Sequence, residues 1–329
     1  MNRETLYTHL SESTMFKKWH WFRWHFQQSL QGNEHPLCKS FVDACLDCER
    51  VIPGFAIGMA DRMASIAGRE KFEPHFEQLL QLFAELHVIR QVVTFDWGKQ
   101  TKFRWEPTAG TSKKNPELVV ENPDFTIGIE VKCPALFDHA RKRSTNPIQL
   151  PARSDAIRSA AENLRKAPDQ ITLPRDNPVK DFLQSTNEKL TPFKLAHTDF
   201  YGVLVVVWDD FIFEPITALI SELSGLFTKN SFHKDTAGIP VRFENVDAVV
   251  LIRHLHQIVH ATRDEPLMDG CRHALDYGQE NVFPYKVLIQ NPNGRPVPGI
   301  LEQCLQTCWP SPQLGSEYIP QDLIFWFDS

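Results

Sequence analysis

The chain has 329 residues, of which 42% are hydrophobic, and it carries a formal net charge of −6. This length allows one large core with additional segments, and the negative balance excludes a protein that is coated with positive charge. No apolar run approaches the roughly 18 residues that a membrane span needs, and the start of the chain lacks a secretory segment. We therefore expect a soluble, cytoplasmic protein that has no membrane partner.

Residues 1–66 are predicted to form a helical N-terminal extension that is rich in aromatic side chains. Between Trp19 and Phe26 there are three tryptophans and two phenylalanines. Such a run usually packs a helix against its neighbours, although aromatic side chains also stack on single-stranded bases. Both interpretations stay open, and packing is the favoured one.

The next elements are expected to be a helix and two strands. Phe72 to Leu86 has apolar residues at helical spacing, with Pro74 in the first turn, where proline is tolerated. Val88 to Phe95 is rich in β-branched and aromatic residues, which predicts a strand. Leu118–Val120 is predicted to begin the strand that follows.

The segment Asn122–Cys133 is the most informative stretch of the chain. We predict two strands that fold back at Thr126–Gly128, because glycine suits the left-handed position of a three-residue hairpin loop. Asp124 then faces Glu130, with Cβ atoms roughly 4.5–5.5 Å apart. Two carboxylates at that separation favour a bound divalent cation, and Lys132 projects from the same face as Glu130. The segment therefore predicts a metal site with an amine beside it.

A single continuous strand from Phe125 to Val131 is the alternative, because its apolar side chains also alternate. Asp124 and Glu130 would then lie about 20 Å apart, at roughly 3.3 Å per residue, and would share no ion. The glycine and the usual shortness of strands favour the turn.

Beyond this segment, a basic, proline-rich connection is followed by helices predicted around residues 154–167 and 178–190. Tyr201–Trp208 is apolar at every position from Val203, as in a strand that is covered on both faces. Asn245–Arg253 and Tyr285–Gln290 are predicted as further strands.

Pro123–Asp124 followed by Glu130–Val131–Lys132 resembles the core motif of the PD-(D/E)XK nuclease superfamily. The resemblance implies an α/β (α+β mixed sheet) fold, with a restriction-endonuclease-like core of a mixed β-sheet flanked by helices. We assign the nuclease core to residues 67–260, and a C-terminal appendage packed on this core to residues 261–329.

The resemblance also implies the chemistry of the site. Asp124, Glu130 and the backbone carbonyl of Val131 would hold Mg²⁺ or Mn²⁺, which would polarise the scissile phosphate and activate a water molecule. Lys132 would orient that water or help to deprotonate it. The alternative role for Lys132 is an ordinary cross-strand ion pair with Asp124.

An acid from the preceding helix often completes the metal site in this family. Glu77 lies beside the apolar stripe of the predicted helix and is preferred over Glu73, which precedes Pro74 and is expected to act as a cap. Glu85, on the last turn, is a weaker candidate. The alternative is that Glu73 and Glu77 are solvated acids of the first turn.

Positive charge is concentrated after the motif. From Lys132 to Lys194 there are twelve lysines and arginines against seven acids, a net charge of +5, while the rest of the chain carries −11. A basic strip beside a metal site suits a polyanion such as DNA, although an ordinary solvated surface is the alternative. The residues that we expect to contact nucleic acid are Arg141, Lys142, Arg143, Arg153, Arg158 and Lys189.

Two functions stay open on this basis. The first is a Mg²⁺-dependent nuclease, expected to be a DNA endonuclease in restriction, phage defence or repair. The second is a catalytically inactive nuclease-fold module that binds nucleic acid or a protein partner. The complete set of Asp124, Glu130 and Lys132 favours the nuclease. Cutting both strands of a duplex would require a homodimer or a second pass.

Seven cysteines in a chain without an export signal are expected to be reduced thiols. Cys38, Cys45 and Cys48 share one helical face, as small core residues do. An iron–sulfur cluster that also uses Cys304 and Cys308 is a less favoured alternative, because the spacing matches no familiar pattern.

Overall fold

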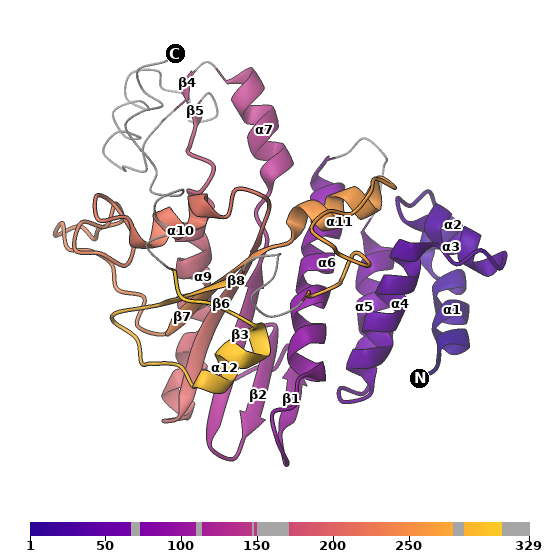
Figure 1. Ribbon diagram of the computed structural model, residues 1–329, viewed down its shortest axis with the longest axis horizontal. Coiled ribbons are helices and arrows are strands. Elements are labelled where there is room, and N and C mark those ends of the chain that lie inside the picture. The colour runs from indigo at the N-terminus through magenta and orange to yellow at the C-terminus, as the bar shows by residue number, and fades with distance from the viewer. Residues whose placement is uncertain (67–72, 110–113, 147, 150–170, 279–285, 311–329) are drawn as a thin grey trace.

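The computed structural model describes residues 1–66, 73–109, 114–146, 148–149, 171–278 and 286–310. Its centre is a six-stranded mixed sheet with helices on both faces (Figure 1). The strands lie in the spatial order β1-β2-β3-β6-β7-β8. Their bounds are Lys102–Trp105 (β1), Leu118–Asn122 (β2), Phe125–Lys132 (β3), Phe200–Trp208 (β6), Ala248–Arg253 (β7) and Lys286–Gln290 (β8).

Strand direction changes across the sheet. β1, β2 and β3 form an antiparallel meander, β3, β6 and β7 are parallel, and β8 is antiparallel to β7. The α/β mixed sheet predicted from the sequence is confirmed, and so are the predicted strands that correspond to β6, β7 and β8. β8 comes from the segment assigned to the C-terminal appendage, so that segment supplies an edge strand of the central sheet.

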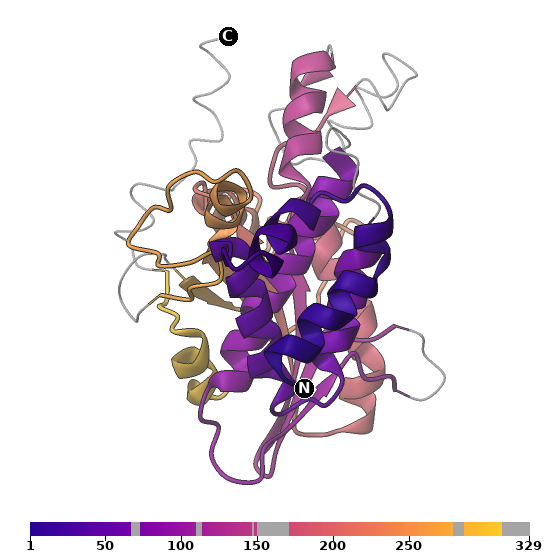
Figure 2. The same cartoon turned by 90° about the vertical axis from the view of Figure 1, so that its right-hand side faces the viewer.

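The N-terminal region is helical, as predicted, and packs against one face of the sheet (Figure 2). Its hydrophobic side chains merge with those of the sheet into one core that extends from Leu6 to Leu305. Phe22 and Phe26 are fully buried in this core, whereas Trp19 and Trp24 are half exposed. The helices are α1 (Arg3–Glu12), α2 (Thr14–Lys17), α3 (Arg23–Leu30), α4 (Pro36–Glu49), α5 (Phe55–Ser65) and α6 (Glu73–Thr94).

Helix α6 is longer than the sequence predicts. The strand predicted for Val88–Phe95 is wrong, because α6 continues to Thr94. Val88, Ile89 and Val92 are fully buried, so tertiary packing overrides the strand preference of their β-branched side chains. The first strand of the sheet is instead β1.

Helices α9 (Pro178–Ala196) and α10 (Phe213–Ile220) cover the other face of the sheet. The helix predicted around 178–190 is therefore confirmed, and the helix predicted around 154–167 lies outside the described residues. Helix α7 projects from one end of the sheet, beside a small parallel pair of strands (Figure 1). The remaining described elements are α7 (Leu136–Thr145), β4 (Ile148–Gln149), β5 (Ile171–Thr172), α11 (Leu255–Thr262) and α12 (Gly299–Leu305). None of the described helices is both long enough and apolar enough to cross a membrane.

The turn predicted at Thr126–Gly128 is wrong, because β3 runs through these residues without a break. The chain reverses earlier, at Pro123 and Asp124, where Asn122 pairs with Phe125 across the hairpin. Asparagine and proline are favoured at the first two positions of a tight turn. The Asn122 side chain also accepts a hydrogen bond from the Asp124 amide at 3.1 Å. The continuous strand, which the sequence leaves as the alternative, is the correct interpretation.

Gly128 is needed for close packing and not for a turn. A Cβ at this position would lie 2.3 Å from Cζ of Phe200 and 3.1 Å from Cδ2 of Leu190. Only glycine therefore lets the side chains of β6 and α9 approach the middle of β3 so closely. Side chains alternate along the strand, so Val131 faces the N-terminal helices and Glu130 faces α9.

Candidate active site

Glu130 and Lys132 lie on the same face of β3, as predicted, but Asp124 does not lie with them. Asp124 is exposed in the turn that precedes β3. The extended strand between Asp124 and Glu130 separates them by about 20 Å, at roughly 3.3 Å per residue. The predicted pairing of these two carboxylates is wrong, and the same separation excludes the alternative ion pair between Lys132 and Asp124.

Glu117 is the acid that lies beside Glu130. Leu118 pairs with Ile129 across β2 and β3, so Glu117, which directly precedes β2, reaches the same end of the sheet as Glu130. Lys189 of α9 bridges the two acids. Its Nζ atom is 3.8 Å from Oε1 of Glu117 and 2.6 Å from Oε1 of Glu130.

A signal for Glu117 is present in the sequence. Pro116–Glu117 is a second Pro–acid dipeptide upstream of Glu130, and it directly precedes the strand predicted at Leu118. An acid at the start of one strand meets an acid near the end of its antiparallel neighbour. A chain reversal at Gly128 leaves Glu117 away from Glu130, so the predicted site does not include Glu117.

Glu130 is fully buried at the centre of this group. Its Oε1 atom accepts a hydrogen bond from the ammonium group of Lys189 at 2.6 Å and forms an ion pair with the ammonium group of Lys132, also at 2.6 Å. Its Oε2 atom is buried and has no hydrogen-bond partner among the described residues. Because a buried acceptor without a partner is costly, this oxygen is available to a cation or a water molecule.

Helix α6 contributes a third acid, Glu85, which is the weaker of the helix candidates in the sequence. Arg62 of α5 donates two hydrogen bonds to the Glu85 carboxylate, at 2.7 and 2.6 Å, and one to Glu106 at 3.2 Å. Carboxylate oxygens of Glu85, Glu106 and Glu117 lie within 4.8 Å of one another. We call the following residues the acidic site: Glu85, Glu106, Glu117, Glu130, Lys132 and Lys189.

Burial and crowding change the pKa values in the acidic site. Burial, followed by the neighbouring Glu85 and Glu130 carboxylates, raises the pKa of Glu117 to about 8. Burial also raises the pKa of Glu85, against the opposing effect of Arg62. Burial acts to lower the pKa of Lys189, but the Glu130 and Glu117 carboxylates raise it above its usual value. At neutral pH most Glu117 side chains are therefore protonated, and a bound cation would displace that proton.

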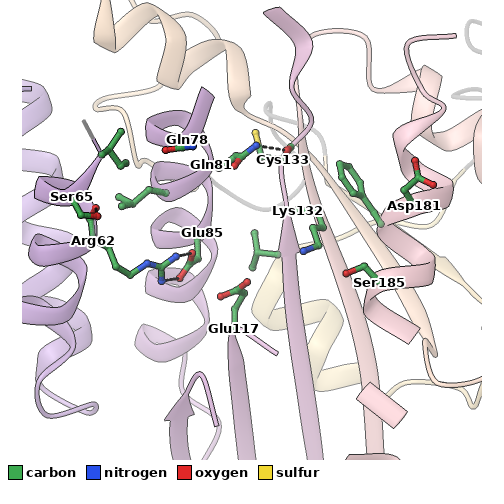
Figure 3. A pocket seen from close by; sticks show the side chains of 14 residues that line it. Arg62, Ser65, Gln78, Gln81, Glu85, Glu117, Lys132, Cys133, Asp181 and Ser185 are labelled. Atoms are coloured by element: carbon green, nitrogen blue, oxygen red, sulfur yellow. Dashed lines mark hydrogen bonds and ion pairs between the residues drawn. The ribbon is translucent and has the colours of Figure 1, made fainter. Parts of the chain in front are cut away.

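Part of the acidic site lines a pocket of about 570 Å³ (Figure 3). The pocket lies where β3 continues past the start of β2, between α6 on one side and α9 on the other. Figure 3 shows Glu117 and Lys132 in the middle, with Arg62 and Glu85 on the α6 side. The other residues that line the pocket include Ser65, Gln78, Gln81, Asp181, Phe182 and Ser185.

Glu77, the helix acid that the sequence favours, lies away from Glu85. Its Oε1 atom accepts a hydrogen bond at 3.0 Å from the backbone amide of Asp138, in the first turn of α7. Glu77 precedes Glu85 by two helical turns, or about 12 Å at 1.5 Å per residue. Glu77 therefore caps α7. Glu73 begins α6, and its side chain lies outside the described part.

The predicted nucleic-acid contacts fall in different places. Arg141, Lys142 and Arg143 are exposed on α7, where the first two form ion pairs with Asp138. Lys189 belongs to the acidic site, where it contacts Glu130. Arg153 and Arg158 lie outside the described residues.

The cysteines are free thiols, and most of them are buried. Cys38, Cys45 and Cys48 lie in the core between α4 and its neighbours, and burial raises the pKa of each thiol. Among the described residues, the groups of side chains close enough to share a metal ion contain no cysteine. These observations agree with the predicted role of small core residues.

Comparison with known proteins identifies no relative of this chain. No family model matches it, and neither does any curated protein or solved structure.

Proposed function

We propose that this chain is a metal-dependent nuclease that hydrolyses phosphodiester bonds, with DNA as the expected substrate. One observation carries the proposal: Glu117 and Glu130 converge beside Lys132 where β2 begins and β3 ends. This arrangement keeps the resemblance to PD-(D/E)XK nucleases, with Pro116–Glu117 in place of Pro123–Asp124.

The donor atoms of the acidic site suit Mg²⁺ or Mn²⁺, because both ions prefer oxygen ligands. Glu117 and Glu130 would hold the ion, and Glu85 lies close enough to Glu117 to complete the set. The Oε2 atom of Glu130, which is buried without a partner, supports this fit. The bound metal would polarise the scissile phosphate and lower the pKa of a water molecule.

Lys132 and Arg62 would support the reaction in different ways. The ammonium group of Lys132 lines the pocket, where it would orient the attacking water and offset negative charge on the phosphate. Arg62 fixes the orientation of Glu85 through two hydrogen bonds, which makes it a positioning residue. Lys189 would hold Glu130 in the same way from α9.

A catalytically inactive module that binds nucleic acid or protein is the second candidate function. The observation that favours it is the pairing of acids and bases within the site. Glu130 already contacts two ammonium groups, and Glu85 contacts the Arg62 guanidinium. An ion-pair network of this kind has a structural role when no metal is bound.

Cleavage assays on purified protein separate the two candidates. Plasmid DNA and single-stranded oligonucleotides would be incubated with Mg²⁺ or Mn²⁺, and then with excess EDTA. We expect cleavage that EDTA abolishes and that Glu117→Gln, Glu130→Gln and Lys132→Ala each reduce by at least about 10²-fold, because each change removes a group that acts on the metal or the phosphate.

Asp124→Asn is the matched control, because Asp124 is exposed in the hairpin turn away from the acidic site. This variant should cleave at the rate of the unaltered protein. Cleavage that survives both Glu130→Gln and Lys132→Ala would refute the proposed nuclease site. Binding of DNA without any cleavage would favour the inactive module.

A further inference from the structure

A second pocket, of about 400 Å³, lies on a different side of α6 from the acidic site. Its walls come from α4, from α6 and from the segment 271–278 that follows α11. We call it the arginine pocket, because three arginines from these three segments line it. Its lining includes Asp47, Arg50, His87, Arg90, Arg272, His273, Asp276 and Tyr277.

His87 is the most unusual side chain of the arginine pocket. Its side chain is only 1% exposed, and neither ring nitrogen has a hydrogen-bond partner among the described residues. The ring stacks on His254 at a centroid distance of 3.9 Å and on Tyr277 at 5.0 Å, so its faces are covered while its polar edge is unused. Buried polar atoms nearly always have partners, and a ligand in the pocket would supply them.

Positive charge exceeds negative charge around the arginine pocket. Asp47 pairs with Arg50 at 3.0 Å and with Arg90 at 2.8 Å, so one carboxylate serves two guanidiniums. Asp276 pairs with Arg272 at 2.7 Å. Three arginines therefore share two carboxylates, and each guanidinium retains N–H donors for a further acceptor.

Lys286 adds positive charge beside Tyr277, one of the residues that line the pocket. Its side chain is buried, its Nζ atom is 4.8 Å from the centre of the Tyr277 ring, and it donates a hydrogen bond to Oε1 of Gln306 at 3.0 Å. No carboxylate forms an ion pair with it in the part of the chain that the structure describes. A buried cation without a counterion raises the electrostatic potential nearby and favours an anion.

We infer that the arginine pocket binds a phosphate group, either as the free ion or as the phosphomonoester of a small molecule such as a nucleotide. Phosphate oxygens match the planar donors of Arg50, Arg90 and Arg272. A neutral His87 offers one donor and one acceptor, so it can bond both a phosphate oxygen and a hydroxyl of the ligand. The inference does not depend on nuclease activity, because no residue of the acidic site takes part.

Thermal unfolding with added ligand tests the inference. Inorganic phosphate and adenosine 5′-monophosphate would each be added to the purified protein, with sodium chloride at matched ionic strength as the reference. A ligand at ten times its dissociation constant should raise the unfolding midpoint by about 2 °C. A rise with both ligands would identify a phosphate site, and a rise with the nucleotide alone would identify a phosphomonoester site.

Variants of the lining residues show whether the effect comes from this pocket. The double variant Arg50→Ala/Arg272→Ala removes two exposed side chains, so the protein should still fold but should lose the ligand-dependent rise of the unfolding midpoint. Arg104→Ala, on β1, is the matched control and should keep that rise. His87→Phe keeps a stacked ring but removes both unpaired nitrogens, so it should raise the midpoint without ligand and weaken the response. No rise beyond the chloride reference in the unaltered protein, or an equal rise in the Arg50/Arg272 variant, would overturn the inference.

Discussion

The ammonium group of Lys189 lies 2.6 Å from Oε1 of Glu130, and this contact joins α9 to the middle of the sheet. The same ammonium group is 3.8 Å from Glu117, so one helix residue organises acids from two strands. The third acid, Glu85, comes from α6, and Arg62 of α5 holds it in place. The acidic site is therefore assembled from α6, the end of β1, the β2–β3 hairpin and α9.

The pKa of Glu117 predicts how the stability of the metal-free protein changes with pH. Its folded-state pKa of about 8 is above the usual 4.5, so the folded state binds a proton that the unfolded state has released in this range. Stability should therefore fall as pH rises from 4.5 to 8. Glu117→Gln resembles the protonated side chain and should remove this loss, which makes it more stable than the unaltered protein by on the order of 2–4 kcal/mol at pH 9.

Denaturant unfolding in EDTA at pH 5 and pH 9 would measure this difference. Asp124→Asn serves as the control, and its effect on stability should not vary between the two pH values. Mn²⁺ should stabilise the unaltered protein at pH 8, because the ion binds the folded state and about half of the Glu117 side chains have already released their proton at this pH. It should have little effect on Glu117→Gln. An equal effect of Glu117→Gln at both pH values would show that Glu117 is ionised throughout.

Gly128→Ala tests the position of the chain reversal. The added Cβ would meet the Phe200 ring at 2.3 Å, and overpacking of this kind costs about 1–3 kcal/mol. Phe200→Leu in the same protein should restore part of the loss, because it removes the atom that clashes. Gly299→Ala, whose Cβ would meet nothing within 4 Å, should be close to neutral.

A turn at Gly128 would give a different pattern in the same measurements. The cost of alanine would then come from a left-handed backbone conformation, and Phe200→Leu would not relieve it. Urea unfolding of Gly128→Ala, Phe200→Leu and the double variant gives the coupling energy between the two changes. A favourable coupling energy indicates a steric clash, and a coupling energy near zero indicates backbone strain.

Local pattern was sufficient to predict the helical N-terminal region and the buried strands of the sheet, but not the way strands pair. The apolar run in β6 reveals a strand covered on both faces without any knowledge of its neighbours. Register is a relation between two segments, and it decides which acids meet. In the sequence, Gly128 favours a turn, and its role in close packing becomes visible only through the side chains of Phe200 and Leu190, which are distant in the sequence.

The sequence predicts only part of the acidic site, because strand register and tertiary contacts are not visible in a local pattern. Glu130 and Lys132 are two residues apart on one strand, so alternation alone places them on the same face. Glu117 and Glu85 reach the site through tertiary packing, which local periodicity cannot predict. On α6, the sequence favours Glu77 because it lies beside the apolar stripe, yet that side chain caps α7.

Glu85→Gln and Glu77→Gln form a matched pair, because both remove one negative charge from the same helix. Glutamine at 77 keeps an oxygen that can accept the hydrogen bond from the Asp138 amide, so the change should be mild. Glutamine at 85 removes a carboxylate that lies within 4.8 Å of Glu117. We expect Glu85→Gln to weaken the apparent Mn²⁺ affinity by about 10–100-fold and to reduce cleavage, whereas Glu77→Gln should retain both.

The unfolding midpoint, measured at increasing Mn²⁺ concentration, gives the Mn²⁺ affinity independently of catalysis. It therefore shows whether a variant that cleaves poorly has lost a metal ligand or holds its substrate in the wrong position. If Glu77→Gln lost Mn²⁺ binding and Glu85→Gln kept it, α6 would contribute its acid two turns earlier, and the metal would lie near Asp138 and the start of α7. If neither variant changed Mn²⁺ binding, Glu117 and Glu130 would hold the ion without help from α6. Glu85 would then serve only as the counterion of Arg62, which joins α5 to α6 through the two hydrogen bonds that Arg62 donates.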